Sequence, residues 1–304
     1  MINDKKIAIL LATYQGESYI KQQLDSLLGQ TYKNWKAFIH DDGSKDQTVR
    51  IVKEYCEKYP DHFSIIEGPS CGGAKGNFFF LTNMVESELY MYCDQDDVWK
   101  SEKVQITLDG MEKISKKEKP CLVFTDLTVV DSNLKVIDNS MSHYQRLDCE
   151  KKGLNRALIQ NVVTGCTMMI NRSLRDLMVK KCDYKNVLMH DWWAAVIANA
   201  FGEAYYIDVP TILYRQHLDN SVGAKKTFSI ENLKAIIRNQ QKVKDALKGT
   251  RIQAAEFYKV FRIKSCKKYA ESGKMPKVKR VVFYFKNGYF KSSLIRNIGL
   301  IIWG

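Results

Sequence analysis

Three aspartates lie within four residues at the end of a short apolar segment. Asp94, Asp96 and Asp97 follow the run Leu89–Cys93, which predicts a buried β-strand. Carboxylates packed this closely repel one another, and a divalent cation between them removes that repulsion. Mg²⁺ and Mn²⁺ are usually held by one or two carboxylates, with substrate phosphates completing the coordination shell. The spacing therefore favours a metal site at the end of this strand.

A solvated turn and a calcium-binding loop are the other interpretations of this segment. Aspartate is common in turns, so an isolated pair of acids would usually indicate one. The calcium loop is excluded because Val98 occupies its fifth position and no glycine follows at the sixth. Three acids at a strand end favour the metal site over the turn without deciding between them.

A second pair of acids follows another predicted strand. Asp41 and Asp42 come directly after Trp35–His40, so they are expected at the same edge of the sheet. Alone, they would indicate a turn with Ser44 or Asp46 as a helix N-cap. Ligands bind beyond the carboxyl ends of the strands in such sheets, so two acidic strand ends together favour the metal site. No GxGxxG follows the first strand and no GxxxxGK occurs, which argues against dinucleotide-binding and P-loop proteins.

Apolar strands that alternate with amphipathic helices are expected to position these acids. In the first half of the chain, continuous apolar runs are followed by segments with apolar residues at helical spacing. This order predicts an α/β protein with a mainly parallel sheet covered by helices on both faces. The predicted strands are Ile7–Thr13, Trp35–His40, Phe63–Ile66 and Leu89–Cys93, and the predicted helices are Glu17–Leu28, Gln47–Tyr59 and Asn77–Val85.

The pattern is looser after about residue 120. Strands are predicted at 121–130, 166–171, 203–209 and 211–217, and a helix at 192–200. From Phe228 to Tyr269 the sequence is helical, with a break expected near Gly249–Thr250. Residues 230–269 could pair two chains as a homodimer or brace the rest of the fold.

Composition indicates a cytoplasmic protein with an anionic partner. The chain has 304 residues, 45% of them apolar, and a formal net charge of +13. Such a basic excess fits nucleic acid, an anionic membrane or a phosphate-bearing substrate. None of the eight cysteines stands at CxxC spacing, so zinc is not expected and reduced thiols are predicted. Neither a signal peptide nor a membrane-spanning run is recognised.

The last 33 residues, 272–304, form a basic tail. They contain seven Lys or Arg and no Asp or Glu, interleaved with bulky apolar residues. This pattern predicts an amphipathic segment lying on an anionic membrane surface. A basic helix packed on the protein and a disordered tail are the alternatives, and the bulky apolar residues argue against disorder. No DNA- or RNA-binding motif accompanies the charge, so no nucleic-acid partner is expected.

Taken as a set, the motifs resemble the inverting GT-A glycosyltransferases of family 2. Four segments match in family order and cover roughly the first 100 residues: ILLATYQGESYIKQQLDSLLGQTYKNW, HDDGSKDQT, GGAKGNF and CDQDDVW. Further on, TGCTMMINRSL, HDWW and YRQHLDNSVG are similar to the rhamnosyltransferase-type branch, whose members build bacterial surface polysaccharides.

The resemblance implies a GT-A fold, which is a Rossmann-like, mainly parallel α/β sheet flanked by helices, with a C-terminal helical extension. Residues 1–225 would form the catalytic domain, with a nucleotide-sugar half at about 1–100 and an acceptor half at about 101–225. Residues 226–304 would form a helical C-terminal region that ends in the basic tail.

The resemblance places the nucleotide against the loops after the first two strands. Thr13 and Tyr14 would lie near the base, although Tyr14 could also be an ordinary half-buried aromatic. Asp42 would accept a hydrogen bond from a pyrimidine N3–H, which uracil and thymine both offer. Asp41 is either part of this site or a turn acid. Lys75, in the loop before a helix, would meet phosphate or remain a solvated lysine.

The resemblance also assigns the metal to the acids after Leu89–Cys93. Asp94 would face the ribose or the metal, Asp96 the metal, and Asp97 is a second candidate ligand. His217 matches a histidine that reaches the metal or diphosphate in some GT-A enzymes, or it is a structural residue. The expected ion is Mn²⁺ or Mg²⁺, which would bridge the diphosphate and stabilise the leaving nucleoside diphosphate.

In the same family pattern, Asp191 would be the general base that takes the proton from the acceptor hydroxyl. It begins a predicted helix, so it could also be an N-cap, and both roles can coexist. Trp192 and Trp193 would be core residues, or one of them would stack on a sugar. His190 stands where many relatives have Glu, and its role is open.

The expected function is a metal-dependent inverting glycosyltransferase. The expected donor is dTDP-β-L-rhamnose, and the expected acceptor is a polyprenyl-diphosphate-linked glycan at the inner face of the cell membrane. A UDP-hexose-dependent enzyme of the same family is the alternative within this class. A catalytically silent nucleotide-sugar or membrane-binding protein is the alternative outside it, and the presence of Asp42, Asp94, Asp96 and Asp191 together argues against it.

Overall fold

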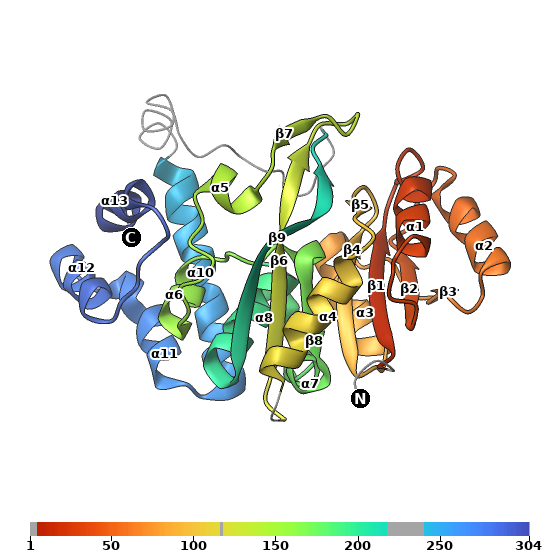
Figure 1. Cartoon of the computed structure of the whole chain (residues 1–304). Coiled ribbons are helices and arrows are strands. Elements are labelled where there is room, and N and C mark those ends of the chain that lie inside the picture. Colours follow the sequence, from red (N-terminus) through yellow and green to blue (C-terminus); the bar gives the residue numbers. More distant parts are fainter. Residues whose placement is uncertain (1–4, 116–117, 218–239, 304) are drawn as a thin grey trace.

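A nine-stranded mixed β-sheet forms the centre of the computed structural model, which describes residues 5–115, 118–217 and 240–303 (Figure 1). The strand order is β3-β2-β1-β4-β8-β6-β9-β5, and β7 pairs with β6. The strands are β1 Ile7–Thr13, β2 Trp35–Asp41, β3 Phe63–Ile65, β4 Leu89–Asp94, β5 Val98–Trp99, β6 Cys121–Val130, β7 Val136–Asp138, β8 Met168–Asn171 and β9 Glu203–Arg215. The helices are α1 Ile20–Leu28, α2 Thr48–Lys58, α3 Ala74–Met84, α4 Lys103–Ile114, α5 Met141–Gln145, α6 Leu154–Ile159, α7 Arg172–Met178, α8 His190–Phe201, α10 Gln240–Phe261, α11 Lys264–Glu271, α12 Lys277–Lys286 and α13 Leu294–Trp303.

The first four strands form a parallel half-sheet. β3, β2, β1 and β4 pair in parallel, so their carboxyl ends lie at one edge. β8 runs antiparallel between β4 and β6, whereas β6 and β9 pair in parallel. Because β8 is antiparallel to β4, the residues before β8 meet the carboxyl end of β4. The predicted α/β class with a C-terminal helical region is confirmed.

Cores on both faces of the sheet explain why the strands lack polar alternation. In β1, Leu10 and Leu11 belong to different cores, since successive side chains of a strand point to opposite faces. Met91 and Tyr92 of β4 divide in the same way. A strand that is covered on both faces has no solvent side on which polar residues would be favoured.

The predicted helix break near Gly249–Thr250 is wrong, because α10 runs through both residues. A Cβ at Gly249 would lie 2.9 Å from a methyl group of Leu188, so the glycine permits close packing without ending the helix. The Thr250 hydroxyl pairs with the Tyr269 hydroxyl at 2.7 Å. The chain instead turns at Arg262, whose φ of +59° is incompatible with a continuing helix.

The two strands predicted at 203–209 and 211–217 are one strand, β9. Its pairing with β6 shifts register beside Pro210, which has no N–H to donate to the ladder. The proline therefore produces an irregularity within the strand, and the strand continues beyond it.

The C-terminal helices share a core with the sheet. Tyr269, Tyr284, Tyr289 and Leu300 belong to the same buried cluster as Trp193 of α8. The predicted domain boundary at residue 225 and residues 230–239 of the predicted pairing segment lie outside the described residues.

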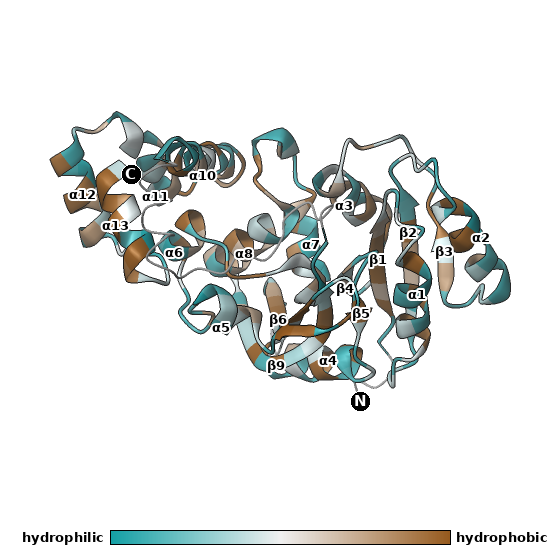
Figure 2. Cartoon of the chain, turned by 90° about the horizontal axis from the view of Figure 1, so that it is seen from above, coloured by the Kyte–Doolittle hydropathy of each residue, from teal (hydrophilic) through white to brown (hydrophobic). Residues whose placement is uncertain are grey.

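Both α12 and α13 expose large apolar side chains, and both helices carry strongly hydrophobic stretches (Figure 2). The exposed side chains are Val278, Val282 and Phe285 on α12 and Leu294, Ile298 and Ile302 on α13. The basic tail thus packs on the protein through one face and presents a second apolar face outward. In the part of the chain that the structure describes, no helix has the length and hydropathy needed to cross a bilayer.

Candidate active site

Asp41 organises the turn after β2. Its carboxylate accepts the backbone N–H groups of Gly43 at 3.0 Å and Ser44 at 2.7 Å. It also accepts the hydroxyl groups of Ser44 at 2.6 Å and of the buried Thr13 at 2.9 Å. The structure thus places Asp41 as a turn acid, with the Thr13 side chain directed to it.

Asp42 holds the loop that precedes α3. Its carboxylate accepts hydrogen bonds from the Ser70 hydroxyl and from the backbone N–H groups of Cys71, Gly72 and Gly73. Burial acts to raise its pKa, but the hydrogen bonds outweigh burial and lower the pKa below its ordinary value. Gly72 and Gly73 have φ of +75° and +118°, which residues with a side chain rarely adopt. Asp42 is therefore an anchored anion at the edge of the sheet.

Lys75 bridges two segments behind this loop. Its Nζ donates to the carbonyl oxygen of Val187 at 2.7 Å, and burial lowers its pKa. The side chain therefore ties the start of α3 to the segment before α8 and is not a solvated loop lysine.

Gln95 joins the loop after β1 to the acidic loop, residues 95–97, which connects β4 to β5. Its Oε1 accepts the N–H of Tyr14 at 2.9 Å, and its Nε2 donates to the Tyr14 carbonyl at 2.8 Å. A Cβ at Gly16 would lie 2.2 Å from Oε1 of Gln95, so the glycine makes room for this pairing. Tyr14 is 56% exposed and accessible to a nucleotide base. The role of Gln95 was not predicted from the sequence, although its position between Asp94 and Asp96 could have indicated it.

The 3₁₀ turn η1 (Gly165–Thr167) connects Asp94 to Asp191. It precedes the antiparallel strand β8 and so meets the end of β4. Cys166 of this turn lies beside Asp94, and the backbone of Gly165 hydrogen-bonds Asp191. The strand predicted at 166–171 includes Cys166 and Thr167, whereas the structure has a 3₁₀ turn there before β8. The role of this turn was not predicted, although the TGC triplet before an apolar strand could have signalled it.

Asp191 is a buried carboxylate surrounded by donors. Asn161 Nδ2 donates to it at 3.0 Å, and the backbone N–H groups of Trp192 and Gly165 donate as well. Burial is the largest effect, and it raises the pKa of Asp191 to about 7 despite these donors. Burial, with the charges of Asp96 and Asp191, also raises the pKa of Asp94 to about 7. A carboxyl group that titrates near neutral pH is suited to general-base catalysis.

His190 packs in the core beneath Asp191. Its ring lies 4.2 Å from the Phe78 ring and 5.0 Å from the Tyr92 ring, measured between centroids. Burial lowers its pKa to about 3, so the imidazole is neutral. A Cβ at Gly165 would lie 2.6 Å from its Nε2, which shows how closely η1 is packed against it. Trp193 is fully buried, as predicted for a core residue.

Asp96 and His217 meet at the edge of the sheet. Asp96 Oδ2 lies 2.8 Å from His217 Nε2, and the two side chains are 15% and 11% exposed. β5 begins directly after the acidic loop and pairs with β9, so the residues after β9 lie over that loop. The structure thus brings together two of the four side chains that were predicted as metal ligands.

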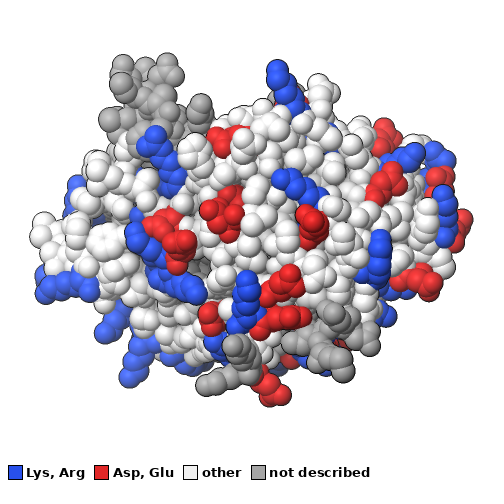
Figure 3. Space-filling view, in the orientation of Figure 1, with Lys and Arg blue, Asp and Glu red and all other residues white. Residues whose placement is uncertain are grey.

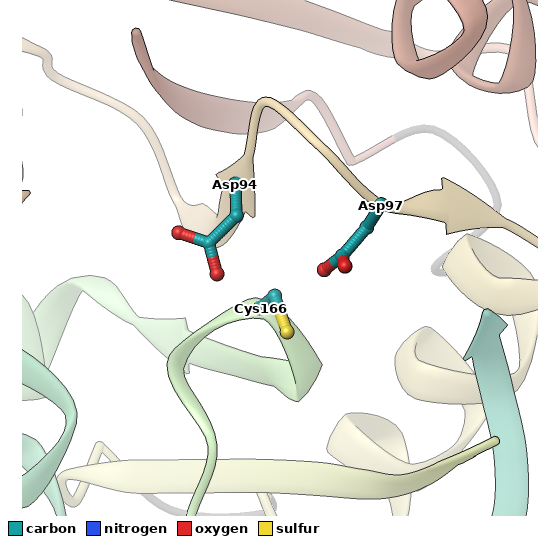
Figure 4. Close-up of side chains that lie close together, drawn as sticks. All are labelled: Asp94, Asp97 and Cys166. Carbon is teal, nitrogen blue, oxygen red and sulfur yellow. The ribbon is translucent and has the colours of Figure 1, made fainter. Parts of the chain in front are cut away.

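Asp97 lies deeper than Asp96. It is fully buried, and its carboxylate accepts the backbone N–H of Arg215 at 3.1 Å. Asp94 and Asp97 point toward Cys166, and one ligand atom from each of the three lies within 4.8 Å of the others (Figure 4). Burial raises the pKa values of the Cys166 thiol and of Asp97 well above their ordinary values, which favours their protonated forms.

Asp96 and His217, with Asp94 beside them, fit a divalent cation better than the buried cluster of Asp94, Asp97 and Cys166. Mg²⁺ and Mn²⁺ favour carboxylate oxygen, with imidazole suited to several transition ions, whereas thiols suit softer metals. Asp96, His217 and Asp94 offer such ligands in partly buried positions, which are less enclosed than those of Asp97 and Cys166. The protonated thiol of Cys166 and the completely buried carboxyl group of Asp97 offer neither suitable ligand atoms nor access for the ion and its diphosphate.

The sequence is similar to known glycosyltransferases. The model of the glycosyl transferase family 2 matches residues 8–177. The dTDP-rhamnosyl transferase RfbG of Shigella flexneri is 30% identical over 258 residues, which cover 78% of this chain and 82% of that protein. The UDP-Glc:alpha-D-GlcNAc-diphosphoundecaprenol beta-1,3-glucosyltransferase WfgD of Escherichia coli is 24% identical over 174 residues, which cover 57% of this chain and 63% of that one.

Solved structures with a similar fold include two proteins in complex with a nucleotide or nucleotide sugar. Staphylococcus aureus TarS in complex with UDP has a TM-score of 0.55 at 15% identity, over 93% of this chain and 92% of that chain. The mannosyltransferase PcManGT from Pyrobaculum calidifontis, in complex with GDP-Man and Mn²⁺, has a TM-score of 0.51 at 14% identity, over 97% of this chain and 79% of that chain. At these identities the likeness concerns the fold alone.

Proposed function

The chain belongs to glycosyl transferase family 2 and is a glycosyltransferase, and from this premise we propose that it is a metal-dependent inverting rhamnosyltransferase. The observation that carries the proposal is the approach of Asp191 to Asp94 through η1 at the carboxyl edge of the sheet. This arrangement puts Asp191, the proposed base for the acceptor hydroxyl, next to Asp94 and the neighbouring acids, which are proposed to hold the donor through a metal ion. The name of the Shigella relative supports dTDP-L-rhamnose as the donor.

The proposed reaction is a single displacement. Asp191 takes the proton of an acceptor hydroxyl as its oxygen attacks C1 of the sugar. The bond between C1 and the diphosphate oxygen breaks, so the configuration at C1 inverts without a covalent intermediate. A divalent cation held by Asp96 and His217, with Asp94 beside them, would supply positive charge to the leaving diphosphate.

Recognition of the nucleotide is proposed at the loops after β1 and β2. The exposed ring of Tyr14 offers a stacking surface for a base, and the Asp42 anion offers an acceptor for a pyrimidine N3–H. Oδ2 of Asp42 accepts one backbone N–H, from Gly73, and retains a lone pair for this bond. Uracil and thymine both fit, so a UDP-hexose is the second candidate donor. The UDP-Glc in the name of the Escherichia coli relative supports it.

The outward face of α12 and α13 supports a location at an anionic membrane. Val278, Val282 and Phe285 recur at spacings of four and three residues and therefore form one stripe of α12. Lys279 and Lys286 lie about 80–100° from that stripe around a helix of 3.6 residues per turn, where they can reach lipid phosphates. In Figure 3, the end of the molecule that carries α12 and α13 shows Lys and Arg but no Asp or Glu.

A polyprenyl-diphosphate-linked glycan is the proposed acceptor at this surface. Such an acceptor is confined to the membrane, so an enzyme bound to the inner face would meet it there. The diphosphoundecaprenol in the name of the Escherichia coli relative supports this class of acceptor.

A panel of nucleotide sugars, scored by thermal shift with Mn²⁺ or Mg²⁺, tests the proposed donor. We expect dTDP-L-rhamnose to raise Tm most and to be consumed with release of dTDP when an acceptor extract is added. A larger shift and turnover with a UDP-hexose would select the second candidate. Binding of a nucleotide sugar without turnover by any acceptor preparation would favour the catalytically silent protein.

A further inference from the structure

The buried side chain of Arg215 connects three segments around the proposed metal site. The residue is 3% exposed. Its Nε donates to the backbone carbonyl of Asp96 at 2.8 Å, its Nη1 to the Ser132 carbonyl at 2.6 Å, and its Nη2 to Gln22 Oε1 at 2.6 Å. The planar guanidinium group can make such divergent bonds at once, whereas a lysine ammonium cannot reproduce them.

Tyr19 contacts both Arg215 and His217. The guanidinium carbon of Arg215 lies 4.7 Å from the centre of the Tyr19 ring. The His217 ring stacks on the same tyrosine at 4.9 Å, with 29° between the ring planes. Arg215 is the last residue of β9, and His217 lies two positions beyond it, the spacing at which the side chains of an extended segment point to the same side. Tyr19 directly precedes α1, and its ring packs against both side chains.

The backbone of Arg215 adds a further link to the acidic loop. Its N–H donates to the buried carboxylate of Asp97 at 3.1 Å, while its side chain holds the carbonyl of Asp96. Two consecutive aspartates of the loop are thus fixed by one residue of β9. The adjacent His217 is held against Asp96 by this attachment and by Tyr19.

We propose that Arg215 and Tyr19 are positioning residues that hold Asp96 and His217 together as a preformed pair of ligands for a divalent cation. The proposal rests on the proposed function only in taking these two side chains as metal ligands. A pair that is already oriented has less conformational freedom to lose when the ion binds. Loss of the support should therefore weaken metal binding more than it weakens the fold.

The test is to measure Mn²⁺ binding by electron paramagnetic resonance, with Mn²⁺ alone and with Mn²⁺ plus dTDP, in Arg215→Lys. Loss of a residue that orients a metal ligand typically costs roughly 10–100-fold in affinity, and we expect a rise of that order in the Mn²⁺ Kd. The kcat at saturating Mn²⁺ should recover toward the wild-type value, while the Mn²⁺ concentration for half-activation rises.

Arg175 provides a matched control. It is 5% exposed, its Nε donates to the Thr82 carbonyl at 2.9 Å, and its guanidinium lies 5.9 Å from the Tyr90 ring centre. Like Arg215, it is a buried arginine that donates to a backbone carbonyl and lies against a tyrosine ring. It differs in lying away from the proposed metal ligands. Arg175→Lys should lower Tm without changing the Mn²⁺ Kd, which separates positioning from general stability.

Two substitutions of Tyr19 complete the experiment. Tyr19→Phe keeps the ring and should retain most of the Mn²⁺ affinity, whereas Tyr19→Leu removes the stacking surface and should weaken it. Equal Mn²⁺ Kd values for wild type, Arg215→Lys and Tyr19→Leu, with binding lost in Asp96→Asn, would overturn the positioning role alone. Mn²⁺ binding that survives in both Asp96→Asn and His217→Ala would overturn the metal assignment as well.

Discussion

Nε2 of His217 lies 2.8 Å from Oδ2 of Asp96, although the two residues are 121 positions apart in the chain. The contact exists because β9 pairs with β5, whose first residue directly follows the acidic loop. An oxygen and a nitrogen ligand held this close can bind one ion together.

Asp96→Asn should lower both Mn²⁺ affinity and transferase activity. Loss of a direct ligand should exceed the roughly 10–100-fold effect of losing its supporting partner, so we expect a rise in the Mn²⁺ Kd of more than about 100-fold. Activity as a function of Mn²⁺ concentration measures the effect. Asp109→Asn, at an exposed acid of α4, is the control and should behave as wild type. Undiminished turnover in EDTA would contradict a metal role.

Asp191→Asn should lower kcat while leaving the donor Kd almost unchanged. The carboxylate is proposed to act on the acceptor proton in the transition state, and a positioned base typically contributes about 10²–10⁴-fold. Steady-state kinetics and calorimetric titration with the donor nucleotide measure the two quantities. An asparagine variant with nearly wild-type kcat would place the base elsewhere.

The rate should rise with pH through the range around 7. Burial raises the pKa of Asp191 to about 7, and only the deprotonated form can accept the acceptor proton. Activity should therefore be lost as the pH falls below this value. Asn161→Ala removes a hydrogen bond to the charged form, so it should move the midpoint to higher pH.

The pH profile of kcat/KM for wild type and Asn161→Ala measures this shift, and Tm values at each pH separate it from unfolding. A midpoint that moves to lower pH in Asn161→Ala, or a rate that falls as the pH rises through 7, would contradict the assignment of Asp191 as the base.

Phe285→Glu and Leu294→Glu together should release the protein from liposomes that contain anionic lipid. Both side chains are exposed, at 53% and 78%, so the change removes apolar contact with the bilayer without opening the core. Truncation after residue 272 is a poorer test, because Tyr284 and Leu300 belong to the main core. Flotation of liposomes measures binding, and higher salt should weaken binding of the wild type only in part.

Ile252→Glu is the matched control for this surface. Ile252 is 42% exposed on α10, outside the two apolar stripes, so its change should leave flotation intact. Equal flotation of the wild type and the double variant would show that α12 and α13 are packing elements and not a membrane anchor.

Much of the fold follows from local patterns in the sequence. Continuous apolar runs predict strands buried on both faces, and β1, β2, β3 and β4 lie close to their predicted bounds. Parallel pairing of these strands puts their carboxyl ends at one edge of the sheet. The sequence pattern alone therefore predicts that the acids at these strand ends lie near one another: Asp41, Asp42, Asp94 and Asp96. Local patterns failed where a residue served distant packing, as at Gly249, which meets Leu188 and does not end a helix.

The contacts that complete the site were decided by the tertiary structure. Asp96 with His217, Gln95 with Tyr14, and Arg215 with Gln22 join residues that lie 121, 81 and 193 positions apart. Each pairing depends on strand order and register, since a shift of one residue turns a side chain to the other face of the sheet. The sequence motifs, together with the family resemblance, indicate which residues could bind a metal or take a proton. Only the assembled sheet determines which of these residues meet, because their contacts depend on the packing of segments distant in the chain.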